Sequence, residues 1–527
     1  MAAASTSRPT AAPTQTPVTP APTTFTGECT QQANGVASPL ILDEATQAST
    51  DLLHTALSTW RNCHGRVLFT QAGQTFTLPG GYVLSRNLTL DASGLSAPVT
   101  LRTGTPVEGS LLAFTPGTNT IPGILARNIV FADHKRVRVG ASGGTFAMGG
   151  IISMQGGPSW AVFESCAFRN NELFFSTNGT GGCGTAGIRV GKTTLARFDD
   201  CVFEGNSATC ESNNAAGGAV AIVDPMGPVS FTRCRWTNNK VAANIPSGAV
   251  SRPYASGAAV FLSNEQVTPE PIPISFSQCS FEANEAHVTP LLPEANFDAA
   301  ACGGAVGGDT HVGKPTLLDV AFSDCTFTGN KAAAHLPPNT GATAKVRLSV
   351  YGAAVGLFAG STARFTDCVI KENVASTEDS APVLGLSNRV YGGGVLLNGA
   401  AATFEATQFI ANTALGPVDA RGGGLYVMGA TNPGLQQGPS SVTISRSTFF
   451  GNRALALGPA GTWAFGGALG AACSSTSATC RIPVQIVASI VKDNSATIQE
   501  TTVVAGGPKD ANAFARKLTT LLRVIPL

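Results

Sequence analysis

The chain of 527 residues has little charge and no long apolar run. Charged residues make up only 12% of it, and 33 Lys and Arg nearly balance 32 Asp and Glu, which leaves a formal net charge of +1. Nucleic acids and anionic membrane surfaces are bound through dense basic patches, which this balance does not provide. No stretch reaches the roughly 18 apolar residues that a transmembrane helix needs. We therefore expect no nucleic-acid partner and no membrane span in this chain.

A secretory leader and a zinc-binding pattern are also missing. The first residues contain no apolar core of the kind found in signal peptides, and residues 1–24 form a Pro, Thr and Ala tract typical of a disordered linker or glycosylated stalk. None of the 13 cysteines lies in a Cys-x-x-Cys pair or a Cys/His cluster with zinc spacing. Two Asn-x-Thr sequons, at Asn87 and Asn178, are candidate N-glycosylation sites of an extracellular protein.

What the sequence does contain is a nine-residue unit, repeated nine times at intervals of 33 to 46 residues. A large apolar residue stands at the first and sixth positions, a small one at the fourth and Asn at the ninth, as in residues 198–206. Seven of the nine units continue as Asn-x-Ala, and a Gly-Gly-Ala-Val-like segment precedes each unit. The ninth positions are Asn171, Asn206, Asn239, Asn284, Asn330, Asn373, Asn412, Asn452 and Asn494.

The spacing within the unit predicts short strands separated by tight bends. The fourth to sixth positions alternate with strand period, and the third position breaks the alternation, which indicates a bend. Short strands at a fixed repeat stack as coils of a solenoid, because each coil buries its apolar face only against its neighbours. Helical repeats would need longer runs at 3.6-residue spacing and fewer glycines. We predict an all-β fold, a parallel β-helix over residues 149–496.

The segments on either side of the repeats are expected to form its ends. Residues 25–148 would form an N-terminal cap with irregular first coils, and residues 497–527 a tail with a short helix. A capping helix is predicted over residues 43–60, whose apolar stripe consists of Ala45, Ser49, Leu52, Leu53, Ala56, Leu57 and Trp60. Residues 509–525 show a second stripe, which would cap the rod or begin a further domain.

Equivalent residues of the units should stack in columns along the rod. The first-position Phe side chains should stack in the core, and each Asn side-chain amide should bond to the next Asn at one inner turn. Six cysteines share the fourth position, which Thr407, Ser447 and Ser489 occupy further along, so we expect reduced, buried space-fillers. They are Cys166, Cys201, Cys234, Cys279, Cys325 and Cys368.

The remaining cysteines are candidates for disulfides. Pairing neighbours along the chain gives three expected bridges. They are Cys29–Cys63, Cys183–Cys210 and Cys473–Cys480.

The variable third position of the unit offers the best place for chemistry particular to one coil. Asp200 and Arg233 would be neighbours there, which predicts a surface ion pair. Asp324 and Asp367 would be like charges one coil apart, which repel unless they bind a cation or share a proton. Two interpretations stay open, two solvated carboxylates or a calcium site. We expect no other cofactor.

The paired motifs, clearest in GGAV at 217–220 and FEGN at 203–206, resemble the repeats of the chlamydial polymorphic outer membrane proteins over roughly residues 149–496. With LPGGYVLSRNLTLDASG at 78–94, the chain is less specifically similar to the pectin-lyase-like superfamily. The resemblance implies a right-handed parallel β-helix and a secreted or surface-exposed, typically adhesive protein.

No known catalytic set stands out in the sequence. β-Helix polysaccharide lyases and glycosidases need paired carboxylates, or calcium with an Arg or Lys base. The Asn-Thr-Asp, Gly-His-Gly and Arg-Ile-Lys motifs of polygalacturonases do not occur.

Our hypothesis is therefore a non-enzymatic extracellular or cell-surface scaffold for adhesion or matrix assembly. It would bind a surface protein or glycan ligand through insertions between coils, at 285–302, 331–351 and 374–391, with 334–351 as the preferred contact loop. Two alternatives stay open. One is a carbohydrate-active β-helix enzyme, with charged residues clustered along one face; the other is a self-assembling module of a larger fibre.

Overall fold

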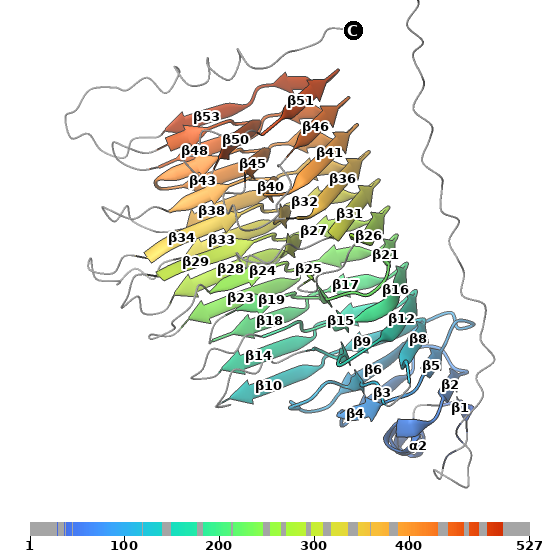
Figure 1. Ribbon diagram of the computed structural model, residues 1–527. Helices are drawn as coiled ribbons and strands as arrows, with labels where there is room; N and C mark the ends of the chain where they lie inside the picture. The colour runs from blue at the N-terminus through green and yellow to red at the C-terminus, as the bar shows by residue number, and fades with distance from the viewer. Residues whose placement is uncertain are drawn as a thin grey trace, which may run out of the picture.

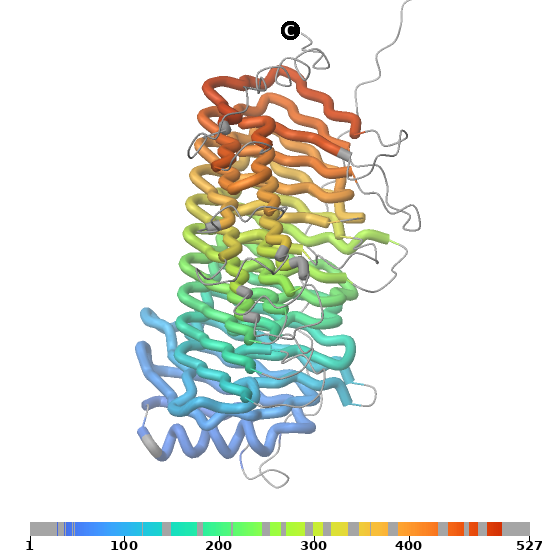
Figure 2. The backbone as a smooth tube through the Cα atoms, turned by 90° about the vertical axis from the view of Figure 1, so that its left-hand side faces the viewer, coloured from blue at the N-terminus to red at the C-terminus, as the bar shows by residue number. Residues whose placement is uncertain are grey.

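The protein is a right-handed parallel β-helix, as the sequence predicts (Figure 1). The computed structural model describes residues 29, 36, 38–44, 46–117, 120–139, 149–176, 183–211, 214–245, 253–264, 270–290, 297–308, 318–335, 346–358, 360–378, 388–429, 441–457, 463–473 and 482–498. Within these described residues, to which the strand counts below refer, each full coil contributes one strand to each of five parallel sheets, numbered 1 to 5 in chain order. Figure 2 shows the coils stacked along one axis above the N-terminal helix.

Sheets 1 and 2 are formed by the repeat units and by the first coils. Sheet 1 has thirteen strands: β1 (Leu40–Leu42), β2 (Gly65–Phe69), β5 (Leu88–Asp91), β8 (Gly123–Arg127), β12 (Ser159–Glu164), β16 (Thr193–Asp199), β21 (Val229–Thr232), β26 (Ile272–Ser277), β31 (Leu318–Ser323), β36 (Thr362–Thr366), β41 (Ala401–Glu405), β46 (Val442–Ser445) and β51 (Val484–Val487). Sheet 2 has twelve: β3 (Thr75–Leu78), β6 (Val99–Thr103), β9 (Ile129–Ala132), β13 (Ala167–Arg169), β17 (Val202–Glu204), β22 (Arg235–Thr237), β27 (Ser280–Glu282), β32 (Thr326–Thr328), β37 (Val369–Lys371), β42 (Gln408–Ile410), β47 (Thr448–Phe450) and β52 (Ile490–Lys492).

Sheets 3 to 5 complete each coil. Sheet 3 has ten strands: β10 (Lys135–Val139), β14 (Glu172–Ser176), β18 (Ser207–Cys210), β23 (Lys240–Ile245), β28 (Glu285–Pro290), β33 (Lys331–His335), β38 (Val374–Glu378), β43 (Thr413–Gly416), β48 (Arg453–Ala456) and β53 (Ser495–Ile498). Sheet 4 has seven: β19 (Ala215–Ala216), β24 (Tyr254–Ser256), β29 (Phe297–Cys302), β34 (Val346–Tyr351), β39 (Arg389–Tyr391), β44 (Asp419–Arg421) and β49 (Trp463–Phe465). Sheet 5 has eleven: β4 (Tyr82–Leu84), β7 (Leu112–Phe114), β11 (Ile152–Met154), β15 (Ile188–Gly191), β20 (Val220–Val223), β25 (Val260–Ser263), β30 (Val306–Gly308), β35 (Val355–Leu357), β40 (Val395–Asn398), β45 (Leu425–Gly429) and β50 (Leu469–Cys473).

Left-handed backbone residues form the corners of each coil. The third position of every unit has φ between 49° and 55°, which confirms the predicted bend between sheets 1 and 2. The eighth position is also left-handed, just before the Asn. The third corner is the first Gly of the glycine motif, as in Gly303, with φ of 54°. Three such corners turn the chain through each coil without a helix.

The main core is built from stacked aromatic columns, as predicted. First-position rings stack along the axis, with centroids 5.1 Å apart for Phe163 and Phe198 and 4.6 Å for Phe198 and Phe231. The sixth position makes a second column, in which Phe203 and Trp236 stack at 5.0 Å. The rings of the two columns meet edge to face, a geometry that is favourable for aromatic pairs.

A second core, which the sequence did not predict, lies between sheets 3 and 4. These two sheets, together called the fin, are lined mostly by Ala, and small side chains allow the facing strands to approach closely. This core explains most of the recurring Asn-x-Ala, because the Ala two residues after the Asn is buried in it in five units, at Ala208, Ala286, Ala332, Ala375 and Ala414. The expected loops 285–302 and 331–351 are therefore largely strands, β28–β29 and β33–β34.

The predicted N-terminal cap is the helix α2 (Gln47–Thr59), followed by the 3₁₀ turn η1 (Trp60–Asn62). The side chain of Thr46 caps the helix by accepting a hydrogen bond from Ser49 N at 3.1 Å. Leu53, Ala56, Leu57 and Trp60 are buried on the first coils. The prediction was wrong for Leu52, which is 47% exposed. Residues spaced i, i+3, i+4 and i+7 from Leu53 already fill the covered stripe, and Leu52 lies about 100° away from it.

Candidate functional site

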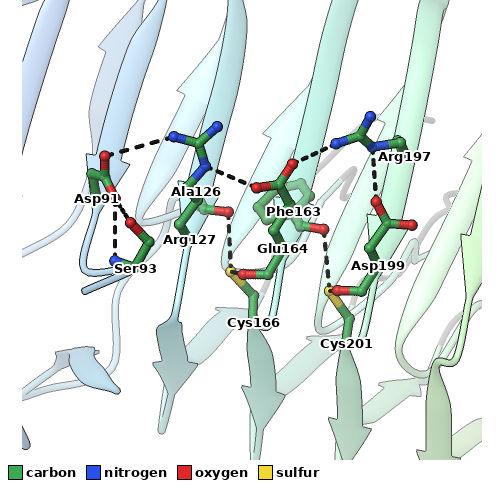
Figure 3. A network of polar contacts seen from close by, with 10 residues as sticks. All are labelled: Asp91, Ser93, Ala126, Arg127, Phe163, Glu164, Cys166, Arg197, Asp199 and Cys201. Carbon is green, nitrogen blue, oxygen red and sulfur yellow. Dashed lines mark hydrogen bonds and ion pairs between the residues drawn. The ribbon is translucent and has the colours of Figure 1, made fainter. Parts of the chain in front are cut away.

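A chain of ion pairs crosses the outer face of sheet 1 over four neighbouring strands, β5, β8, β12 and β16 (Figure 3). Arg127 lies between two carboxylates, with its Nη1 3.7 Å from Asp91 Oδ2 and its Nε donating to Glu164 Oε2 at 2.8 Å. Arg197 also lies between two carboxylates, since its Nη2 donates to the shared Glu164 Oε1 and its Nε is 2.9 Å from Asp199 Oδ2. Opposite charges therefore alternate along the rod.

A cavity of about 300 Å³ lies next to this chain of charges. It is lined by Ser93, Leu95, Arg127, Asn128, Glu164 and Ser165. Both carboxylate oxygens of Glu164 are bonded to arginines. The negative charge of Glu164 at the cavity wall is therefore neutralised. The arrangement ties the coils together and offers polar groups to a ligand.

The nine Asn side chains form the predicted ladder. Asn239 shows the pattern, because its Nδ2 donates to Asn284 Oδ1 and to Phe203 O, both at 2.9 Å. Its Oδ1 accepts from the backbone N of Asn206 at 3.1 Å and from Asn206 Nδ2 at 2.9 Å. The same bonds continue from Asn171 to Asn494. The ladder is thus a structural element that satisfies the polar groups of one corner.

The six-cysteine column is a line of buried thiols in the structure. Cys234 Sγ donates to Phe198 O at 3.3 Å, and Ser447 Oγ donates to the equivalent Phe404 O at 3.5 Å. The cysteine thiol and the serine hydroxyl therefore occupy the same position of the unit and donate to equivalent backbone carbonyls. Burial raises the pKa of Cys166 to about 12, which disfavours a reactive thiolate.

The three disulfides predicted for the other cysteines have different outcomes in the structure. Cys29 and Cys63 form a disulfide beside the capping helix. The expected Cys183–Cys210 bridge is not formed, because both are buried thiols in the core of the fin, where they contact each other as space-fillers. Cys480 lies outside the described residues and the Cys473 side chain is not described, so that pair has no structural account.

The third-position residues lie on the surface as predicted. Arg233 Nε donates to Asp200 Oδ1 at 2.6 Å and Arg233 Nη2 to Asp200 Oδ2 at 2.8 Å, and this partner lowers the pKa of Asp200. Asp324 and Asp367 occupy neighbouring left-handed corners. No group of three or more His, Cys, Asp or Glu side chains gathers into a metal site within the described part of the chain.

The remaining predicted sites are placed as follows. Asn87 is half-buried in the folded chain. Asn178, the tract 1–24 and the stripe 509–525 lie outside the described residues. Residues 336–345, the middle of the preferred contact loop, also lie outside them. Within the described ranges, no helix is long and apolar enough to cross a membrane.

Sequence reasoning missed one repeat unit, at residues 126–134, which it assigned to the irregular coils. Asn128 and Asp133 are its left-handed corners, and His134 stands in the place of the ladder Asn. The backbone N of His134 donates to Asn171 Oδ1 at 3.2 Å, as a ladder residue does. Burial, and then the charge of Arg136, lower the pKa of this ring to about 4. The spacing of the apolar residues was the signal that would have identified the unit.

We expect His134 to make the fold acid-sensitive. Its folded pKa of about 4 lies below the unfolded value of about 6.5, so the unfolded chain binds more protons between these limits. The stabilisation is complete above pH 6.5 and is lost as the pH falls towards 4, by about 3 kcal/mol. Urea unfolding at pH 7.0, 5.5 and 4.0 should show a smaller loss for His134→Asn. Equal losses in the two proteins would contradict this assignment.

Comparisons with known proteins add little evidence about the fold of this chain. No family model and no curated protein sequence matches the chain. The chain is similar to the crystal structure of tailspike protein 3 of bacteriophage CBA120, at 10% identity and a TM-score of 0.23. The match covers 84% of this chain and 58% of the tailspike chain, so this chain spans less than two thirds of that structure. The fold assignment therefore rests on the parallel sheets themselves.

Proposed function

We propose that this protein is an extracellular or cell-surface rod that acts as a non-enzymatic scaffold in adhesion or matrix assembly. Its coils are held by the Asn ladder and two cores, so the frame is continuous over the described strands. A rigid frame preserves the relative positions of the groups it presents, which is what a solenoid binding surface requires. Its partner would be a surface protein or a glycan.

The observation that carries the proposal is the variable connection between the two sheets of the fin. In one coil β43 and β44 are joined by residues 417–418 alone, whereas β33 and β34 are joined by residues 336–345. All these connections leave from the same edge of the fin, since the strands within each sheet are parallel and in register. Variation in length at one edge of an otherwise regular frame favours a recognition role.

The test combines a glycan array, a pull-down from matrix and cell-surface extracts, and a polysaccharide cleavage assay. We expect binding without cleavage. Replacing residues 336–345 by a four-residue Gly/Ser link should reduce binding at least tenfold and leave the melting temperature unchanged. Shortening residues 265–269 is the matched control, since they join β25 of sheet 5 to β26 of sheet 1, outside the fin, and this change should leave binding unchanged. Release of fragments from any polyuronate would overturn the non-enzymatic proposal.

A carbohydrate-active enzyme is the second candidate, because charged side chains do cluster beside a cavity on sheet 1. In that case Glu164 would contact the substrate, and Glu164→Gln would abolish cleavage while Asp319→Asn, on the same face, would not. If the parent protein cleaves no polysaccharide, this candidate is excluded.

A module of a larger assembly is the third candidate, favoured by the last described coil. Ile490 is 62% exposed and Val491 54% exposed there, although Val491 continues the column of the buried Phe449. End-to-end association would cover these side chains. Sedimentation velocity should then show a mass that rises with concentration and falls with Val491→Asp; a constant monomer mass excludes it.

Calcium binding at Asp324 and Asp367 is a separate proposal, based on two carboxylates at stacked corners. If the site exists, calcium should raise the melting temperature of the parent protein and not that of Asp324→Ala. Asp493→Ala, at an exposed corner of the last coil, is the control. An absence of any calcium effect on the parent protein would remove the site.

A further inference from the structure

One tryptophan lies on the outer face of sheet 1, away from both cores. Trp160 of β12 is half-buried, whereas the core residues Trp60 and Trp236 are at most 1% exposed. Alternate residues of a strand point to the same side, so Trp160 shares the outer face of β12 with Glu164. The frame of the coils does not require an aromatic ring in this column, because later coils fill it with Leu195, Pro228, Pro273, Asp319, Thr362 and Ala401.

The indole of Trp160 lies flat over the neighbouring strand. Gly123 of β8 pairs with Trp160 in register, and a Cβ added to this glycine would lie 2.1, 2.2 and 2.4 Å from the indole Cε2, Cδ2 and Nε1. Similar short distances to three consecutive ring atoms place this point over the face of the ring and not beyond its edge. Glycine at position 123 therefore lets one face of the indole rest on sheet 1, and the opposite face points outward.

The strand pairing beside Trp160 is irregular. The register of β12 and β16 shifts between Ser159 and Trp160, so Thr194 of β16 is an extra residue with no counterpart in β12. The Oγ1 of Thr194 donates to Ser159 O at 3.1 Å. Such bulges change the direction of nearby side chains and are common beside active sites. The irregularity therefore marks the position of Trp160 as a departure from the plain repeat.

Polar groups that a sugar can bind stand further along the same face of β12. Glu164 lies about 13 Å from Trp160, at the usual rise of a strand. The cavity of about 300 Å³ beside Glu164 is also lined by Ser93, Arg127 and Asn128. An oligosaccharide, but not a single sugar, could therefore reach from the indole to this cavity.

Two of the cavity residues keep a polar atom that no other group uses. Arg127 contacts Asp91 and Glu164 through Nη1 and Nε, and its Nη2 has no partner in the described ranges. Asn128 donates its Nδ2 to two backbone carbonyls, so its Oδ1 remains an acceptor. A donor and an acceptor in one cavity suit a sugar hydroxyl, because a hydroxyl both donates and accepts hydrogen bonds.

The charges on this face favour a neutral ligand. Three carboxylates, those of Asp91, Glu164 and Asp199, alternate with two guanidinium groups, those of Arg127 and Arg197 (Figure 3). The small excess of negative charge would repel a uronate or a sulfated sugar.

We propose that the outer face of sheet 1 binds a neutral oligosaccharide along β12, with one sugar ring stacked on Trp160 and another bonded in the cavity beside Arg127. The C–H groups on the face of a pyranose ring carry partial positive charge and pack against the negative face of the indole. An aromatic surface with a few placed polar groups is the usual composition of a small-ligand site. The inference rests on the proposed extracellular role, for which it names a class of glycan, and it involves no residue of 336–345.

The test is fluorescence anisotropy of the full chain with labelled neutral tetrasaccharides from cellulose, xylan, mannan and β-1,3-glucan, and with tetragalacturonate as the acidic probe. We expect saturable binding of at least one neutral probe, unaffected by added NaCl, and none of the acidic one. Trp160→Ala should weaken binding by about tenfold or more, because a stacked Trp commonly dominates a binding surface, and Trp160→Phe should weaken it less. No binding of any neutral probe, or tighter binding of tetragalacturonate, would overturn the inference.

Trp463→Ala is the matched control, since this side chain is 53% exposed on sheet 4 and lies outside the site. It should bind the neutral probe like the parent protein, and circular dichroism and melting temperature should show that all variants fold. The variant with a Gly/Ser link in place of 336–345 separates the two proposals. Binding that this variant keeps and Trp160→Ala loses supports the sheet 1 site. Binding that Trp160→Ala keeps and the link variant loses would place the glycan at the fin, which contradicts the sheet 1 site and leaves the proposed function intact.

Discussion

Replacing Asn239 by Ala should destabilise the protein by about 3–5 kcal/mol. The side chain is fully buried, donates to Phe203 O and Asn284 Oδ1, and accepts two bonds from Asn206. Alanine leaves these partners enclosed without replacements, which costs more than the net value of the lost bonds. Urea unfolding followed by circular dichroism would measure the change.

The neighbouring Asn238 provides a control of the same chemistry. It is exposed at the eighth position, with φ of 55°, and Ala283 holds the equivalent corner in the next coil. Asn238→Ala should therefore cost about 1 kcal/mol or less. If the two variants unfold at the same urea concentration, the ladder is not a major source of stability.

Replacing Gly303 by Ala should have an effect at least as large, about 4 kcal/mol or more, and should reduce the soluble yield. Its φ is 54°, and an added Cβ would lie 2.1 Å from Val306 O and 2.5 Å from Gly307 Cα. Both contacts are with backbone, so neither can be relieved by a side-chain rotation. The free energy of unfolding from urea titration is the measurement.

Gly329 lies in the repeat unit that follows Gly303. Replacing it by Ala tests the cost of the left-handed backbone conformation without the steric contact. Its φ is 62°, and a Cβ there would meet nothing within 4 Å. Gly329→Ala should therefore cost only about 1 kcal/mol, the usual penalty for a left-handed alanine. Ala406 and Ala488 already occupy left-handed corners in this chain. A large loss in Gly329→Ala would show that φ alone, and not the Val306 carbonyl, selects glycine.

The repeat made much of the fold predictable. Because each coil contacts only its neighbours, a residue type that recurs at one position of the unit reports a column, and the Phe, Cys and Asn columns all lie where the spacing places them. The change from Cys368 to Thr407 indicated a buried space-filler, and both side chains donate to the first-position carbonyl of the preceding unit. The ion pair of Asp200 and Arg233 could be predicted for the same reason, because both residues stand at the third position of neighbouring units.

Predictions failed where one strand meets another that is distant in sequence. The fin was read as loops, because alanine carries little hydrophobic signal and its burial depends on a facing sheet. The Cys183–Cys210 bridge was inferred from proximity along the chain, whereas the fin core accommodates two thiols. The unit at 126–134 was missed because His134 replaces the Asn that marked the others.

The class of fold, the repeat and the inner columns could be predicted from the amino-acid sequence, because they depend on local strand period and on contacts between adjacent coils. Which charged side chains are buried, paired or exposed depends on how the coils lie against one another in space. Arg136 and Arg138 lie in columns that Leu173 and Phe175 fill in the next coil, and Arg127 and Arg197 are neutralised because the register places carboxylates beside them. Burial and pairing of charge are set by neighbours in space, which one-dimensional spacing does not specify.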